Sequence, residues 1–183
     1  MTWDRLAYQP YFSSSAANVG YGLWSHDIVG GDGSDPELFL RWIQWGAWSS
    51  IFRTHDRGMS SGGCQVNENG CNLLFPWDLP QDLFVHARFA LQTRSRLIPY
   101  IYTATYKMHK SLKSFLRPMY WDFPKDTDSF KACTIDGEMS QYMFGDEMFI
   151  APVVSPSDPD TKLATKKVRL DKEQSDDLDC IAL

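Results

Sequence analysis

The chain has 183 residues, with 18 Lys and Arg against 23 Asp and Glu, and 43% of its residues are apolar. That apolar content, combined with a net charge of only -5, excludes a disordered protein, and there is no basic excess that would suggest a nucleic-acid partner. No run of about 18 apolar residues is present to cross a membrane. The chain is also too short for a complete (β/α)8 barrel, which needs roughly 200 residues or more.

The first third of the chain predicts a helical segment followed by a strand–helix–strand unit. Residues 5–20 favour an amphipathic helix or helix pair, and residues 20–31 indicate a buried strand that ends in glycines. Asp35 and Pro36 form a helix start, because Asp is a good N-cap and Pro fits the first helical position. A second short strand is expected at residues 50–55. A helical crossover of this length joins parallel strands.

The middle of the chain predicts a long loop and then an interrupted helix. Residues 56–78 are rich in Gly, Ser and Asn, and structureless loops of this length are usually functional rims or lids. Helical spacing of apolar residues then runs from Pro80 to about Lys110. Pro99 is expected to break or kink this helix.

The last part of the chain predicts a β-rich module and an acidic tail. Short apolar runs bounded by Gly and Pro occur at residues 117–124 and 142–154, a pattern typical of strands. Residues 171–183 contain five acidic residues and one Lys, which account for -4 of the net charge, and we expect this tail to be disordered.

Two polar side chains follow the two predicted parallel strands. Asp27 ends the first strand and His55 the second. Ligands of parallel α/β sheets bind at the carboxyl ends of the strands, so these side chains are expected to converge on one pocket. A carboxylate and an imidazole there can hold adjacent hydroxyls of a sugar. From periodicity alone, a loop cap and a core histidine are the simpler interpretation.

Arg53 and two tryptophans are further candidates beside this pair. Arg53 alternates with His55 and so lies on the same strand face, from which it can pair either with Asp27 or with a neighbouring helix. Trp24 and Trp77 offer flat rings that suit stacking on sugars, although packing in a core is the more common role of such residues.

No metal or cofactor is predicted. The chain has neither a CxxC pair nor two His residues at i, i+4 spacing, and its four cysteines leave the cellular compartment undetermined. Residues 180–183 match the C-a-a-X prenylation pattern. The residues before it are acidic, whereas a membrane-binding flank is basic, so we do not expect lipidation there.

Seven short motifs occur in one order within residues 3–170: 24–31, 36–42, 52–55, 76–77, 96–102, 117–118 and 144–153. As an ordered set they resemble glycoside hydrolase family 31, which contains α-glucosidases, α-xylosidases, glucosidase II catalytic subunits and sulfoquinovosidases. The resemblance implies a retaining α-glycosidase of carbohydrate metabolism, with an α-glucoside or α-xyloside as substrate.

The same resemblance implies an α/β fold, a partial TIM barrel followed by the beginning of a β-sandwich. Residues 1–112 would be the C-terminal part of the (β/α)8 barrel, with strands seven and eight at 20–31 and 50–55. Residues 113–170 would begin the proximal C-terminal β-sandwich domain. The acidic tail at 171–183 has no counterpart in the family.

For the site, the resemblance implies binding of the sugar at the non-reducing end. Asp27 matches the Asp of the family's D-I-G-G-F motif, and His55 matches the His of its R-x-H motif. Arg53 and Trp24 are counted with them as substrate-binding candidates. Gly31 stands where the motif has Phe, which removes one wall of the subsite.

The catalytic carboxylates of the family have no match in the chain. Retaining hydrolysis needs two carboxylates about 5–5.5 Å apart, a nucleophile and an acid/base. The family's nucleophile lies in a W-x-D-M-N-E-type motif, which is absent here, and its acid/base lies in a Gly-Asp pair before the Trp that matches Trp3. We therefore expect no catalytic residue and no activity from this chain alone. The alternative is a non-catalytic carbohydrate-binding or interaction remnant.

Overall fold

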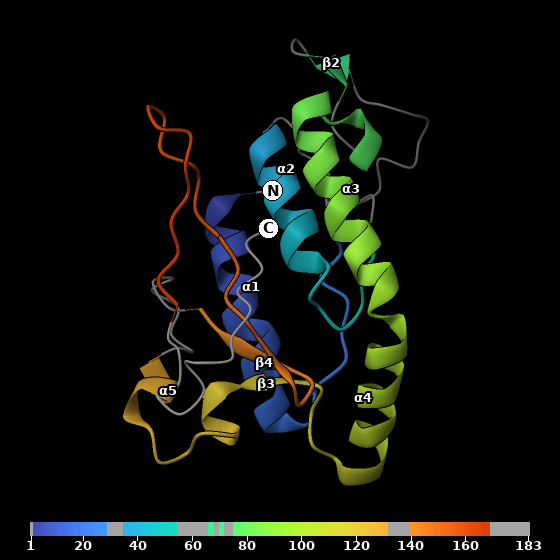
Figure 1. Cartoon of the computed structure of the whole chain (residues 1–183), viewed down its shortest axis with the longest axis vertical. Coiled ribbons are helices and arrows are strands. Elements are labelled where there is room, and N and C mark those ends of the chain that lie inside the picture. Colours follow the sequence, from blue (N-terminus) through green and yellow to red (C-terminus); the bar gives the residue numbers. More distant parts are fainter. Residues whose placement is uncertain are drawn as a thin grey trace.

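The computed structural model describes residues 2–28, 35–54, 66–67, 70–71, 75–131 and 140–168. Four helices form most of it (Figure 1): α1 (Trp3–Ser15), α2 (Pro36–Gly46), α3 (Gln81–Arg96) and α4 (Ile98–Ser111). Helix α2 packs against α3, and α4 continues beyond α3 along the same side of the molecule.

Helix α1 confirms the prediction of a helix near the N-terminus. The side chain of Thr2 caps it by accepting a hydrogen bond from the backbone N–H of Arg5 at 3.3 Å. Leu6 is fully buried on its inner face. The chain continues into the 3-10 helix η1 (Ala16–Val19), which ends at Gly20 with φ 76°, a left-handed conformation that glycine adopts without strain.

Helix α2 begins where the sequence predicts. The side chain of Asp35 accepts hydrogen bonds from the backbone N–H groups of Glu37 and Leu38 at 3.0 and 3.1 Å, and Pro36 occupies the first turn. The other carboxylate oxygen of Asp35 accepts a hydrogen bond from the Trp3 indole at 3.1 Å. One side chain therefore fixes the start of α2 and ties it to α1.

The chain segments on either side of α2 pair in parallel, as predicted. Over the described parts of the expected strands, residues 20–28 and 50–54, they do so through two isolated bridges, Ser25 with Ile51 and Ile28 with Thr54, and not as continuous strands. Each segment has a described neighbour on one side only, so fewer backbone hydrogen bonds hold it extended than in a closed barrel. Helix α2 lies close above them, and a Cβ on Gly46 would overlap the Ile28 side chain.

Most of the predicted loop at 56–78 lies outside the described residues. The described parts contain a minimal antiparallel pair, β1 (Val66–Asn67) with β2 (Gly70–Cys71), and the 3-10 helix η2 (Pro76–Asp78).

The predicted interrupted helix is present as α3 and α4, which meet at Leu97. Pro99 lies in the first turn of α4, where a missing N–H does no harm, and this explains why one helix ends and another begins. Ala87 and Ala90 are fully buried on α3, whereas no residue of α4 is fully buried.

The β-rich module is a three-stranded antiparallel sheet in the order β3 (Leu116–Pro118), β4 (Tyr142–Phe144), β5 (Met148–Ile150). The predicted run at 117–124 leaves the sheet early, because residues Met119–Trp121 form the 3-10 helix η3. The short helix α5 (Thr127–Lys131) follows before the chain returns as β4.

One hydrophobic core joins the N-terminal helices to this sheet. Leu6, Phe39, Trp45, Phe115 and Phe144 are among its buried members, so α1, α2 and the sheet bury their apolar faces together. The predicted division between residues 112 and 113 therefore crosses a shared core, and as a domain boundary it stays a prediction.

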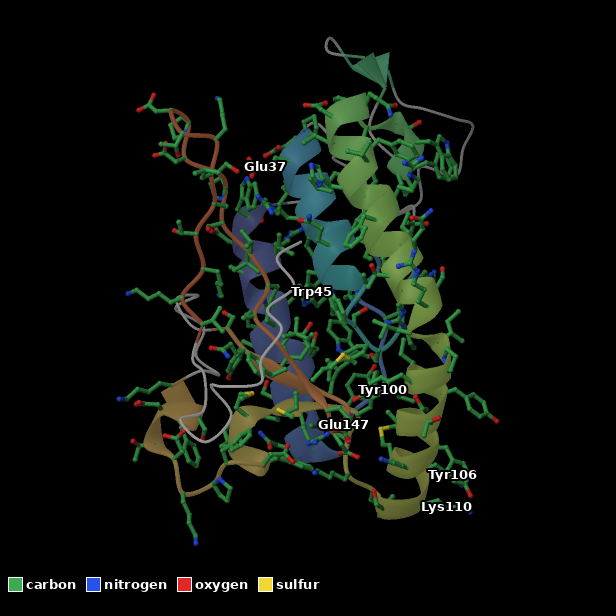
Figure 2. The ribbon with its side chains drawn as sticks, viewed as in Figure 1. Glu37, Trp45, Tyr100, Tyr106, Lys110 and Glu147 are labelled. Carbon is green, nitrogen blue, oxygen red and sulfur yellow. The ribbon has the colours of Figure 1, made fainter. Side chains whose placement is uncertain are left out.

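The segment after β5 returns along the molecule to α2 (Figures 1 and 2). There the backbone N–H and the hydroxyl of Ser157 both donate to the Glu37 carboxylate, at 3.0 and 2.5 Å. The acidic tail at 171–183 lies outside the described residues. Within the described ranges, no helix has the length and apolar character needed to span a bilayer.

Candidate functional site

Asp27 and Arg53 come together at the ends of the two parallel segments. The Arg53 Nε atom lies 3.6 Å from Asp27 Oδ1, and the Ser25 hydroxyl donates to the same oxygen at 3.0 Å. The backbone N–H of Ile28 donates to the carbonyl oxygen of Arg53 at 2.9 Å, and this hydrogen bond holds the ends of the two parallel segments in register. Of the two interpretations open for Arg53, pairing with Asp27 is therefore the one that the structure contains.

This pair faces solvent. The Arg53 and Asp27 side chains are 52% and 35% exposed, so their mutual attraction is screened by water and contributes little to stability. A guanidinium only donates hydrogen bonds and a carboxylate only accepts them, whereas a hydroxyl does both. An exposed Arg–Asp pair is therefore suited to bind neighbouring hydroxyl groups.

The backbone at Asp27 has an unusual conformation. Its φ is 51°, in the left-handed region that non-glycine residues rarely adopt, although Asp tolerates it better than most. Such outliers are often found at binding sites, where the surrounding structure holds them in place. Here the bridge between Ile28 and Thr54 fixes the chain directly after Asp27.

Trp24 lies on the other face of this segment. Its ring packs edge-on against Phe12 with centroids 4.6 Å apart, and its ring contact with His26 has a centroid distance of 5.9 Å. The backbone of Trp24 is clamped by Ser50, whose hydroxyl donates to the Trp24 carbonyl at 3.0 Å. These contacts give Trp24 a packing role, and its part in substrate binding stays a prediction.

His26 directly precedes Asp27 and is buried, because successive side chains of an extended segment point to opposite faces. Only 8% of it is exposed, and its ring centroid lies 4.0 Å from that of Trp45 and 6.3 Å from that of Trp42. Burial lowers the pKa of His26 to about 3; the Asp27 charge opposes this shift and Arg94 adds to it. His26 is therefore neutral near pH 7.

His55 and Gly31 lie outside the described residues, so the expectations for them stay predictions. Thr54, the residue directly before His55, is bridged to Ile28. Arg94 was not predicted as part of this region. Its guanidinium donates to the carbonyl oxygens of Ala47, Ser49 and Ser50, at 3.1 Å for Ala47 and 2.9 Å for Ser50. A signal existed, because Arg94 stands in the apolar periodicity of α3 where a hydrophobic residue is expected.

No group of three or more His, Cys, Asp or Glu side chains arranged to hold a metal ion occurs among the residues that the structure describes. The site therefore consists of one exposed ion pair at the ends of two adjacent parallel segments, with buried aromatic residues packed behind these segments.

Comparison with known protein families identifies the class. A family profile described as the glycosyl hydrolases family 31 TIM-barrel domain matches residues 1–104, and one described as the glycosyl hydrolase family 31 C-terminal domain matches residues 113–170. The chain belongs to glycoside hydrolase family 31. Its fold is the partial TIM barrel, followed by the beginning of the C-terminal domain, that the resemblance implied.

Two relatives illustrate the match in sequence. The chain is 31% identical over 155 residues to an alpha-xylosidase of Emericella nidulans, covering 84% of this chain and 17% of that protein. It is 31% identical over 152 residues to the human neutral alpha-glucosidase AB, covering 82% of this chain and 14% of the relative. The chain thus spans less than a fifth of the length of either of these curated relatives.

Solved structures agree in fold. A xylosidase from Aspergillus niger superposes with a TM-score of 0.69 at 27% identity, over 85% of this chain and 23% of that one. A family 31 alpha-xylosidase from a soil metagenome, complexed with xylose, has a TM-score of 0.67 at 23% identity over 90% of this chain and 28% of its own. The second likeness concerns the fold alone.

Proposed function

We propose that this chain carries the sugar-binding strand ends of a family 31 α-glycosidase and, by itself, binds a sugar without cleaving it. The observation that carries the proposal is the Asp27–Arg53 pair, which is exposed to solvent where two adjacent parallel segments end. In barrels of this class ligands bind at that edge. The match of Asp27 and His55 to the family's sugar-binding motifs supports the same assignment.

The substrate class is an α-glucoside or an α-xyloside of the whole enzyme. Two relatives that the chain matches are named as an alpha-xylosidase and a neutral alpha-glucosidase. In this proposal the Asp27 carboxylate accepts from one sugar hydroxyl, and Arg53 and His55 donate to its neighbour. Trp24 supports the segment from its buried face, and we assign it no stacking role.

The proposal assigns no catalytic residue to this chain. The family's nucleophile motif is absent from the sequence, and no Gly-Asp pair stands before Trp3, where the family has its acid/base. Without a nucleophile no glycosyl-enzyme intermediate forms, and without an acid the leaving oxygen is not protonated. Binding groups such as Asp27 cannot replace either step. Hydrolysis requires carboxylates that the 183 residues do not supply.

The binding part of the proposal is tested by calorimetric titration of the 183-residue chain with xylose and with glucose. The Asp27→Asn variant is expected to weaken binding about fivefold or more, because a lost hydrogen bond to a charged group is worth about 1–3 kcal/mol. The control is Asp160→Asn, an exposed aspartate on another segment, which should leave the affinity unchanged. If neither sugar binds the wild-type chain, the interaction-remnant alternative takes the place of the proposal.

The catalytic part is tested separately with an aryl α-glucoside and an aryl α-xyloside. The chain is expected to release aryl alcohol no faster than buffer does. Turnover that disappears in Asp27→Asn would contradict the proposal, because it would require a carboxylate pair within these residues.

A further inference from the structure

A hollow lies away from the ends of the two parallel segments. It is formed by α4, the segment that follows α4, and the turn between β4 and β5. It is a cavity of about 370 Å³. The charged side chains that line it are Lys107, Lys110, Lys113, Arg117 and Asp146. Three separate parts of the chain thus bring four cations and one carboxylate to the same hollow.

The charged side chains around this cavity are connected by ion pairs. The Arg117 guanidinium contacts two carboxylates, with Nε 2.6 Å from Asp122 and Nη2 3.1 Å from Asp146. Lys113 Nζ lies 2.7 Å from Asp122, and Lys107 Nζ lies 3.1 Å from Asp146. Arg117 also donates to the carbonyl oxygen of Ser114 at 3.1 Å and is only 1% exposed. The floor of the cavity is therefore built around a buried charge.

Positive charge remains in excess after these pairs are formed. Four cationic side chains line the cavity, and two carboxylates, Asp122 and Asp146, contact them. Both carboxylates are ionised near neutral pH. Burial opposes ionisation of Asp122, but hydrogen bonds from Arg117 and Lys113 outweigh it and lower its pKa. The hydrogen bond from Lys107 is the main cause that lowers the pKa of Asp146.

Lys110 is the cation that these carboxylates do not neutralise. Within the described part of the chain its ammonium makes no ion pair, and it lies 5.5 Å from the centre of the Tyr106 ring. Figure 2 shows Tyr106 and Lys110 near the C-terminal end of α4, with side chains directed outward from the helix. An ammonium has three N–H donors, so Lys107 and Lys113 also keep donors after their contacts with carboxylates.

The remaining wall is apolar. Ala104 and Met108 of α4 line it together with Phe115, whose backbone N–H donates to the Met108 sulfur at 3.3 Å. The volume is in the range of small-molecule sites, about 300–1,000 Å³, and an apolar wall beside a few convergent polar groups is their usual composition.

We propose that this cavity binds a phosphate or sulfate group, either as the free anion or as the monoester of a small organic molecule. The N–H donors to the anion's oxygens come from Lys107, Lys110 and Lys113. The buried guanidinium of Arg117 adds positive charge at the floor of the cavity. The wall formed by Ala104, Met108 and Phe115 receives the organic part of a monoester. Because other elements form this site, the inference does not depend on the proposed sugar site.

The test is calorimetric titration of the full chain with inorganic phosphate, inorganic sulfate and glucose 6-phosphate at low ionic strength. Saturable binding of at least one of them is expected, and it should weaken markedly at about 1 M salt, where charges are screened within about 3 Å. Tighter binding of the ester than of inorganic phosphate would assign the apolar wall to the organic part. Equal affinities would assign the site to the free anion. Failure of all three to bind would overturn the inference.

Variants distinguish a site from a structural ion cluster. Lys110→Gln is expected to weaken binding about fivefold while the melting temperature stays the same, because it breaks no ion pair between described residues. Lys125→Gln, at an exposed lysine outside the cavity, is the matched control and should bind as the wild type does.

Asp146→Asn supplies the opposite test. Removing a negative charge from the rim should tighten binding of the anion several-fold, even though Arg117, Lys107 and Lys113 each lose an ion pair. A purely structural cluster would show lower stability and no gain in affinity. An unchanged affinity in both Lys110→Gln and Asp146→Asn would contradict the proposed site.

Discussion

Two Arg–Asp pairs in this chain have opposite surroundings. The side chains of Arg117 and Asp122 are 2% and 18% exposed, with a 2.6 Å contact, and Arg117 shares a second carboxylate. Those of Arg53 and Asp27 are 52% and 35% exposed, with a 3.6 Å contact. In the first pair the guanidinium is buried and bonds two carboxylates, so its removal would take several charged hydrogen bonds from the fold. The second stays accessible, so its atoms can exchange water for a ligand at little cost to the fold.

The largest expected effect follows from removing the buried member. Arg117→Ala leaves Asp122 and Asp146 with only their lysine partners, and it removes the buried member of the charge network. It is expected to lower the free energy of unfolding by about 3 kcal/mol. Urea denaturation followed by circular dichroism measures this. The control is Lys131→Ala, which breaks an exposed pair with Asp128 at 2.7 Å and should change stability by no more than about 0.5 kcal/mol. Equal effects of the two substitutions would refute the distinction between buried and exposed pairs.

The next effect is a dependence on pH that comes from His26, the buried neighbour of Asp27. Its folded-state pKa of about 3 lies below the unfolded value of 6.5, so the stability due to its neutral form is complete above pH 6.5. That stability is lost as the pH falls from 6.5 towards 3, by about 1.4 kcal/mol for each pH unit. Between pH 7 and pH 5 the wild-type chain should therefore lose about 2 kcal/mol.

The variant His26→Leu isolates the contribution of His26 to the pH dependence, because leucine fills the buried position without a group that titrates. Its stability should change less than that of the wild type over the same pH interval, measured by urea denaturation at each pH. If the two curves run parallel, His26 is not the group responsible.

A smaller effect concerns the turn between β4 and β5. At Gly145, φ is 70° and a Cβ would overlap the Tyr100 hydroxyl, which donates to the Phe144 carbonyl at 2.9 Å and accepts from the backbone N–H of Glu147 at 3.2 Å (Figure 2). Gly145→Ala should cost about 2 kcal/mol or more of stability. Gly20→Ala has a similar φ of 76° but open space, so it should cost only the strain, about 1 kcal/mol. The difference between their melting temperatures measures the crowding by Tyr100.

The smallest effect on stability is expected at the proposed sugar site itself. Asp27→Asn breaks an exposed pair at 3.6 Å, so the free energy of unfolding should change by no more than about 0.5 kcal/mol. Its effect should be confined to sugar binding. A loss of several kcal/mol in urea denaturation would show that Asp27 secures the fold, and the interpretation as a loop cap would then be correct.

The local features of the fold were predictable from the sequence because their causes are local. Asp35 and Pro36 define the start of α2 through side-chain capping and a fixed φ, and Pro99 explains why α4 begins where it does. The parallel pairing followed from a crossover of one helix length. The strands were shorter than predicted because periodicity reports burial and does not report how many neighbours a strand can bond to.

The candidate site was predictable only in part. The alternation of a strand placed His26 opposite Asp27, and the pairing of Arg53 with Asp27 was one of two interpretations that the sequence allowed. The charged cavity could not be predicted, because Arg117 and Asp146 are 29 positions apart and meet only when β4 pairs with β3. Distances of this kind depend on sheet register, which the sequence does not give for such short strands.

The most direct test of sugar binding at the Asp27–Arg53 pair is a map of backbone amide shifts in the 183-residue chain as xylose is added. Saturable shifts are expected only at the ends of the two parallel segments, residues 25–28 and 51–54, and they should disappear in Asp27→Asn. Shifts centred on other elements that persist in this variant would contradict this assignment, because the sugar would then bind without the Asp27–Arg53 pair.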